Sequence, residues 1–188
     1  MLNKFYSQFD MTGNLHYLHN NLYLMNIPFF MLPIEALTGL LEITDVEIQK
    51  KIYTQVKKST KDKMLPQFGL YFGTTDKKKE TNFILEYLTY SGWGSVQIID
   101  LEIESKRAII VVENSPFAAA LKGKIQLPAD VFLRGILAGL FSKIFEEDID
   151  CVEAECAAHT SERCKFIIKP KLEFDFGNPI VQQQISHE

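Results

Sequence analysis

The chain has 188 residues, of which 46% are hydrophobic and 23% charged, and these values are ordinary for one compact globular domain. Its formal net charge of −4 provides no broad electrostatic attraction to nucleic acid, so nucleic-acid binding is disfavoured. No window reaches the ~18 uninterrupted apolar residues of a membrane-spanning helix, and the N-terminus lacks the apolar run of a secretion signal, so we expect a cytoplasmic protein without a membrane span.

The N-terminal third predicts a hairpin followed by two helices. Residues 13–33 contain two β-prone segments, and Asn20 and Asn21 between them can adopt the positive φ of a tight turn. The pattern becomes helical over residues 34–41. A Thr-Asp pair can then cap a second helix over residues 46–58.

The middle of the chain predicts a loop, a helix and an antiparallel pair of strands. The lysine-rich run at 57–63 is typical of a solvated helix end or loop, and Pro and Gly residues interrupt any period over 64–75. The segment DKKKETNFILEYLTYSG then favours a helix that Gly92 closes. Residues 95–104 and 107–114 alternate as strands on either side of a charged turn.

The last third predicts two helices and a second hairpin. Ser115 can cap a short helix that begins at Pro116, and residues 127–150 have the apolar period of a long amphipathic helix. Residues 151–170 alternate as strand, loop and strand. The tail at 171–188 has no clear period, and we expect its last ten residues to be frayed. Gly135 and Gly139 lie one turn apart in the long helix, which indicates close helix packing or a dimer seam.

All three cysteines lie within the second hairpin, which favours reduced thiols or a metal site over a disulfide framework. Glu153, Cys156 and Cys164 are spaced so that a short hairpin can gather them, and His159 lies in the intervening loop. Strict alternation would put Glu153 and Cys156 on opposite faces of one strand, so joint ligation requires a bulge or a strand end there. The alternative is that the cysteines are ordinary core residues.

The chain is also rich in aromatic residues, with 14 Phe, seven Tyr and one Trp. Aromatic side chains fill cores, and they also line apolar ligand cavities. Trp93 lies in a Gly-Trp-Gly turn, Phe117 on the short helix, and Phe132 and Ile136 one turn apart on the long helix. These four residues predict an apolar ligand pocket, with simple core packing as the alternative.

The order of four motifs resembles the 4-vinyl reductase (4VR) domain, in particular small archaeal proteins described as predicted hydrocarbon-binding proteins. The motifs are GWG at 92–94, ENSPFA at 113–118, RGILAGLF at 134–141, and E-x-x-C-x7-C followed by KFIIKP. The resemblance implies an α+β fold, with an antiparallel sheet packed against helices, akin to core subunits of the TRAPP vesicle-tethering complex and to haem-based nitric-oxide sensor domains. Such domains usually form homodimers and enclose an apolar pocket.

The resemblance also implies how the chain is organised. We expect one 4VR-like domain over residues 1–188. The hairpin and helices of 1–75 precede the most recognisable part at 80–170, and the tail follows at 171–188.

In related aromatic-sensing transcription activators, a structural zinc is held by a Glu, two hairpin Cys and one Cys at the start of the long helix. By position the resemblance assigns this zinc site to Glu153, Cys156 and Cys164, with Asp130 in place of the fourth ligand and His159 as its rival. Asp is a harder and shorter ligand than Cys, so this departure weakens the match.

The resemblance favours a binding module for a small hydrophobic or aromatic molecule. A homodimeric assembly subunit without a ligand is the main alternative. A role in vinyl-group reduction is weaker, because the sequence has no nucleotide-binding glycine loop, no metalloprotease helix motif and no nucleophile elbow. We predict no catalytic residues and no enzymatic activity.

Overall fold

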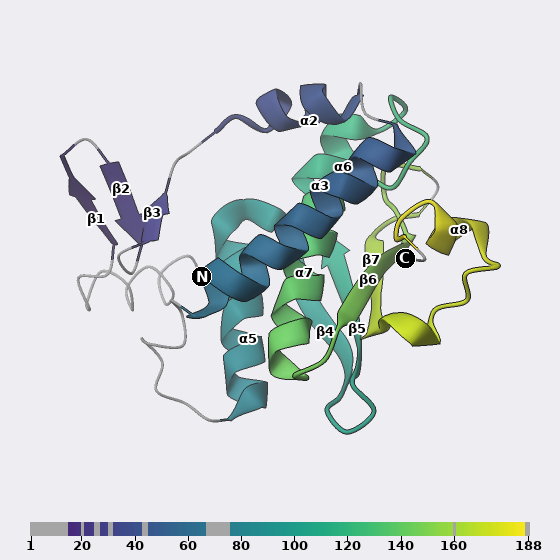
Figure 1. Ribbon diagram of the computed structural model, residues 1–188. Coiled ribbons are helices and arrows are strands. Elements are labelled where there is room, and N and C mark those ends of the chain that lie inside the picture. The colour runs from purple at the N-terminus through teal and green to yellow at the C-terminus, as the bar shows by residue number, and fades with distance from the viewer. Residues whose placement is uncertain are drawn as a thin grey trace.

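The computed structural model describes residues 15–19, 21–24, 27–29, 32–42, 45–66, 76–159 and 161–186. Helices and two antiparallel sheets make up this part of the chain (Figure 1). The first sheet has the order β1-β2-β3, with the bounds Leu15–Leu18, Asn21–Leu24 and Ile27–Phe29. The predicted N-terminal hairpin is therefore confirmed, and β3 is a strand that the sequence did not predict.

Two helices follow, α2 (Ile34–Glu42) and α3 (Val46–Ser59). The Asp45 side chain caps α3, because its Oδ1 accepts a hydrogen bond from the Ile48 N–H at 2.8 Å. The lysine-rich run at 57–63 is a helix end and not a loop, since α3 continues into the π-helical turn η1 (Thr60–Met64). The loop predicted at 64–75 lies outside the described residues from 67 onward.

The second sheet has the order β4-β5-β7-β6, and all its neighbouring strands are antiparallel. Its strands are β4 (Ser95–Glu102), β5 (Arg107–Glu113), β6 (Ile149–Glu155) and β7 (Cys164–Pro170). Both predicted hairpins are confirmed. The sequence did not predict how they join: β7, the last strand of the sheet in chain order, pairs with β5 and lies inside the sheet.

Helices cover one face of this sheet, with α7 (Val131–Ile144) closest to it and α3 crossing α7 on the outside (Figure 1). The helix α5 (Lys77–Leu88) and the turn η2 (Thr89–Trp93) lead into β4, and α6 (Pro116–Leu121) follows β5. The long helix is shorter than the predicted 127–150, because β6 already begins at Ile149.

Gly135 and Gly139 let α3 approach α7 closely. A Cβ on Gly135 would lie 2.7 Å from Cβ of Val56, and a Cβ on Gly139 would lie 2.5 Å from the carbonyl oxygen of Lys57. Real Cβ atoms do not approach other heavy atoms so closely, so the glycines are required by helix packing. This confirms the helix-packing interpretation of the Gly-x3-Gly spacing.

The C-terminal segment is folded back onto the domain. It contains the short helices η3 (Lys171–Glu173) and α8 (Pro179–Gln182), and Val181, Gln184 and Ile185 are buried. The prediction that the last ten residues are frayed is therefore wrong for residues 179–186. Within the described part of the chain, no helix has both the length and the apolar character that crossing a membrane demands.

Candidate functional site

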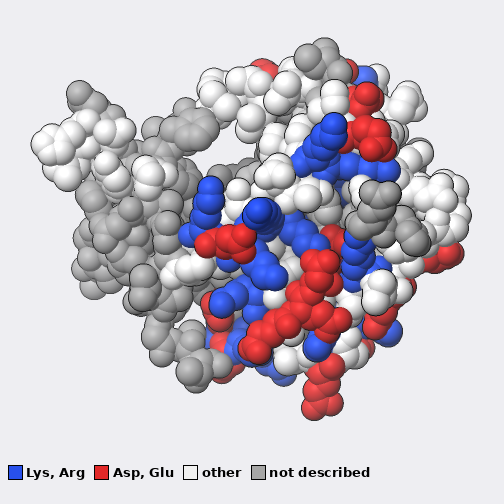
Figure 2. All heavy atoms as spheres, viewed as in Figure 1, with Lys and Arg blue, Asp and Glu red and all other residues white. Residues whose placement is uncertain are grey.

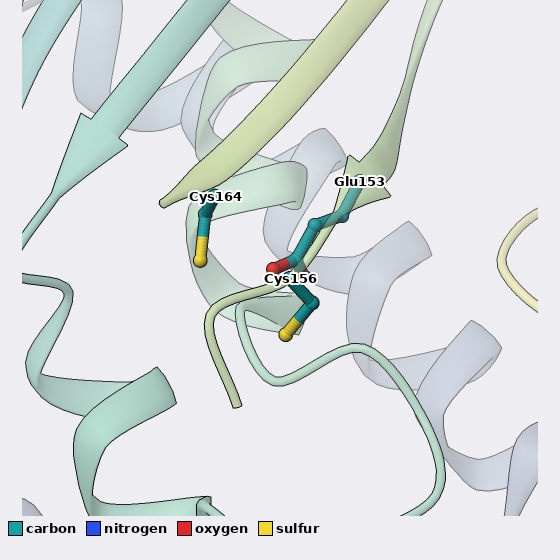
Figure 3. Close-up of side chains that lie close together, drawn as sticks. All are labelled: Glu153, Cys156 and Cys164. Carbon is teal, nitrogen blue, oxygen red and sulfur yellow. The ribbon is translucent and has the colours of Figure 1, made fainter. Parts of the chain in front are cut away.

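Glu153, Cys156 and Cys164 meet at the open end of the β6–β7 hairpin (Figure 3). One donor atom from each side chain lies within 4.8 Å of the other two, and all three residues are buried. Two sulfur ligands at about 2.3 Å from one zinc ion are at most about 4.6 Å apart, so the donors are close to the spacing that one ion requires. The sequence prediction that the hairpin gathers these residues is confirmed.

A bulge in β6 makes this convergence possible. Glu153 pairs with Phe166 and Glu155 pairs with Lys165, so the pairing register shifts by one residue between them. The extra residue cancels the alternation that would place Glu153 and Cys156 on opposite faces. Cys156 then follows the end of the strand and turns toward the same side as Glu153 (Figure 3).

Backbone N–H groups point at the donors of the cluster. Ala129 N donates to Cys156 Sγ and Ala157 N donates to Cys164 Sγ, both at 3.4 Å. Asp130 N donates to Glu153 Oε2 at 3.1 Å. The other carboxylate oxygen of Glu153, Oε1, is buried and has no hydrogen-bond partner among the described residues. An unpartnered buried oxygen beside two thiols is an arrangement that a cation would satisfy.

The two candidates for a fourth ligand differ in position. The Asp130 carboxylate is buried beside the cluster, and Ser115 Oγ donates to its two oxygens at 2.9 and 3.0 Å. It falls outside the set of mutually close donors. His159 is exposed, and its Nε2 lies 3.1 Å from the Leu127 carbonyl oxygen. Asp130 is therefore the better placed of the two, although its carboxylate would have to turn away from Ser115 to ligate an ion.

The electrostatics of the cluster match those of a cation site. Burial raises the pKa of Glu153, and burial raises the pKa of Asp130 to about 6. The Cys164 thiol donates a hydrogen bond that lowers the pKa of Cys156 to about 5 and raises the pKa of Cys164 itself. Four acidic groups thus share one buried space, where a cation would favour the ionised form of each. Two thiolates and a carboxylate are donors that zinc accepts.

Three of the four residues predicted to line a ligand pocket contact each other. The rings of Trp93 and Phe117 are stacked, with centroids 5.4 Å apart, and the Phe117 and Phe132 centroids are 5.8 Å apart. These residues come from η2, α6 and α7, and we call them the aromatic cluster. Phe117 at its centre is only 3% exposed.

Ile136, the fourth predicted pocket residue, lines a hollow of about 540 Å³ on the side of α7 that faces α3. The other residues around this hollow come from β3, α3 and η1: Pro28, Gln55, Val56, Ser59, Thr60, Lys63 and Met64. No contact between Ile136 and the aromatic cluster is described. The structure thus brings three of the four residues together and places the fourth at a separate hollow.

A polar cleft of about 320 Å³ lies between α3 and the end of β6, and Figure 2 shows the basic side chains over α3 beside acidic ones. Lys57 Nζ lies 2.7 Å from Asp148 and 2.8 Å from Asp150. The Tyr53 hydroxyl donates to Asp150 at 2.6 Å. These contacts fasten α3 to β6.

Several residues around the cluster were missed by the sequence reasoning. Arg134 is the only charged residue within the apolar run VFLRGILAGLF, and a buried position was not expected for it; it is 1% exposed. Gln184 lies in a Gln-rich tail without a period, so no sequence signal distinguished it. Ser115 was predicted only as a helix cap, and it also donates to Asp130.

Residues 108–170 match a family model for the vinyl-4-reductase (4VR) domain. The chain carries a 4VR domain over these residues. The match lies within residues 80–170, the part in which the sequence resembled this family, and that resemblance is confirmed. No curated protein matches the chain.

Solved structures share the fold around this 4VR domain. The phenol-responsive sensory domain of the transcription activator PoxR, crystallised with phenol, superposes with a TM-score of 0.74 at 15% identity, covering 93% of this chain and 94% of that one. A vinyl-4-reductase family protein from Methanocaldococcus jannaschii gives a TM-score of 0.50 at 19% identity, with coverage of 75% and 83%.

A third similar structure is trafficking protein particle complex subunit 3 from Naegleria fowleri, covalently bound to palmitic acid. Its TM-score is 0.50 at 12% identity, with coverage of 72% of this chain and 88% of that one. At such identities the three likenesses establish the fold. They confirm the mixed fold of helices and antiparallel sheet that was predicted.

Proposed function

We propose that this protein is a sensory module that binds a small hydrophobic or aromatic molecule. The observation that carries the proposal is the aromatic cluster of Trp93, Phe117 and Phe132, in which side chains from three separate elements meet. The PoxR domain, whose fold covers nearly the whole chain, responds to phenol. An apolar ligand among these rings gains about 25 cal/mol for each Å² of buried apolar surface, and it needs few polar contacts.

Trp93 makes the proposal straightforward to test, because it is the only tryptophan in the chain. Phenol, a medium-chain fatty acid and an isoprenoid alcohol would each be titrated while Trp93 fluorescence and the melting temperature are recorded. A ligand that binds the folded state raises the melting temperature by mass action, and at 100 times its Kd the gain is about 2.7 kcal/mol. We expect one of these classes to change both signals.

A matched pair of variants then locates the binding. Phe132→Trp enlarges a ring of the aromatic cluster and should abolish the thermal shift of any compound that binds there. Ile99→Trp adds the same ring on β4, where Ile99 is 59% exposed, and should leave the shift intact. If no compound acts on the wild type, or if both variants bind normally, the rings simply fill the core. The alternative of an assembly subunit without a ligand would then be favoured.

We further propose that Glu153, Cys156 and Cys164 hold a structural zinc ion with Asp130 as the fourth ligand. A closed site with four protein ligands fastens the β6–β7 hairpin to the start of α7 and leaves no open position for chemistry. The support is the mutual proximity of the donors and the unpartnered Glu153 Oε1.

Elemental analysis of the purified protein tests the metal site. We expect about one zinc per chain in the wild type and in Cys151→Ser, because Cys151 is buried on β6 but is not in the set of close donors. Cys156→Ser should lose the metal. Zinc that is absent from the wild type, or that survives in Cys156→Ser, would show that these cysteines are core residues.

The homodimer implied by the family resemblance stays a prediction. Its interface is expected to include the region of the long helix or the N-terminal hairpin. Light scattering at micromolar concentration should return about twice the chain mass of 21.6 kDa. A species at the single-chain mass would contradict it.

A further inference from the structure

Gln184 anchors the C-terminal segment of residues 179–186 to the domain. Its side chain forms two hydrogen bonds with the backbone of Glu153: Glu153 N donates to Gln184 Oε1 at 2.8 Å, and Gln184 Nε2 donates to the Glu153 carbonyl at 2.9 Å. Its own carbonyl accepts from Arg134 Nη1 at 3.1 Å, and its N–H donates to the Val181 carbonyl at 3.0 Å. Gln184 is 1% exposed, and every polar group that it has is paired.

The Gln184 amide takes the place of a neighbouring strand. β6 is an edge strand, so the N–H and C=O groups on its outer side have no partner strand. Two side chains cover this edge in succession. The Tyr53 hydroxyl accepts from Cys151 N at 2.9 Å, and two residues further along Gln184 pairs with both backbone groups of Glu153. Residues two apart on a strand present their backbone groups to the same side, so the two caps follow one row.

The residue that Gln184 holds is the carboxylate member of the candidate metal site. The backbone of Glu153 is fixed by β7 on one side and by Gln184 on the other. Its carboxylate is oriented by Asp130 N, and Oε1 is the oxygen left over. The register shift directly after Glu153 weakens the pairing with β7 there, so the Gln184 amide is the main restraint on this end of the strand.

We propose that Gln184 is a positioning residue for the metal site, so that metal binding at Glu153 and docking of the 179–186 segment stabilise each other. This inference rests on the zinc binding proposed above. When the segment is docked, Glu153 is held where its carboxylate meets Cys156 and Cys164. When it is released, the Glu153 N–H and C=O lose their partners and the strand end is free to move. Such coupling is reciprocal, so bound metal must hold the segment in place as strongly as the segment favours the metal.

Two neighbouring glutamines provide a matched pair of variants. Gln184→Met keeps the length of the side chain but removes both hydrogen bonds to Glu153. Gln183→Met makes the same change at the adjacent exposed residue. Zinc affinity would be measured for each by competition with a chromophoric chelator. Loss of a group that orients a metal ligand typically costs about 10- to 100-fold in affinity. We expect a loss of this size in Gln184→Met and an unchanged affinity in Gln183→Met.

Hydrogen exchange of the wild type supplies a readout that a purely structural role would not move. Adding zinc to metal-free protein should slow exchange at the amides of residues 181–185, and Cys156→Ser should show no such change. This measurement also stands if Gln184→Met fails to fold.

The outcomes separate this inference from the metal proposal itself. If the wild type binds no zinc, the metal site fails and the coupling fails with it. If the wild type binds zinc but the two Met variants have equal affinity, or zinc leaves exchange of the segment unchanged, only the coupling is overturned.

Discussion

Gly139 of α7 lies against the backbone of Lys57 of α3, so that a Cβ on Gly139 would be 2.5 Å from the Lys57 carbonyl oxygen. Because the obstacle is backbone, Gly139→Ala can be accommodated only if the helices separate. We expect a loss of about 1–3 kcal/mol in the free energy of unfolding, measured by urea denaturation. Gly39→Ala in α2 is the control: its Cβ meets nothing within 4 Å, and it should stabilise by about 0.5–1 kcal/mol. Equal effects of the two variants would show that α3 and α7 are not in this contact.

The Tyr53 hydroxyl joins α3 to the edge of β6, since it donates to Asp150 and accepts from Cys151 N. Tyr53→Phe would leave that buried N–H without a partner, which costs about 1–3 kcal/mol. Thr54→Ala, on the next residue of the helix, removes only an exposed hydrogen bond and should change stability by less than about 0.5 kcal/mol. Chemical denaturation of both variants measures the difference. A Tyr53→Phe protein as stable as Thr54→Ala would disprove the role of the hydroxyl.

The two glycines around Trp93 should respond differently to alanine. Both have positive φ, 94° at Gly92 and 103° at Gly94, but a Cβ on Gly92 meets nothing within 4 Å. A Cβ on Gly94 would lie 2.6 Å from the Glu113 carbonyl oxygen. Gly92→Ala should therefore cost about 1–2 kcal/mol from the backbone conformation alone, and Gly94→Ala clearly more. Thermal unfolding monitored by circular dichroism would rank them, and the reverse order would be inconsistent with this turn.

Phe117 shields the Trp93 ring by stacking on it. Phe117→Ala removes this ring from the core, and we expect it to cost about 3–5 kcal/mol and to shift the Trp93 emission to longer wavelength. Phe174→Ala is the control, because Phe174 is also buried but its ring contact is with Lys169. It should destabilise without moving the emission of the folded protein. An unshifted emission in Phe117→Ala would contradict the stacking.

Local features of the fold could be predicted because they depend on nearby residues. The helix caps at Asp45 and Ser115 and the hairpin of β4 and β5 follow from side-chain chemistry and alternation over a few positions. The insertion of β7 beside β5 depends on contacts between distant segments, and no local pattern encodes it. For the same reason the burial of the C-terminal segment was missed.

The candidate site was predicted in part. The spacing of Glu153, Cys156 and Cys164 was sufficient to place them in one hairpin, but the bulge that lets them converge is a register shift, which alternation alone cannot locate. Arg134 and Gln184 were missed because polar residues are predicted to be exposed unless their partners are known. Those partners lie on other elements, far away in the sequence.

During synthesis, the four-stranded sheet cannot close until its last strand has left the ribosome, because β7 lies between β5 and β6. Until then β5 is paired with β4 alone, and its other edge, next to the buried side chains of Ile110, Val111 and Val112, stays open. Pairing of Ala108 with Ile168 closes a long stretch of chain, which is intrinsically slow. Open apolar strand edges recruit other chains, so the nascent protein is most exposed to aggregation just before its final hairpin is inserted.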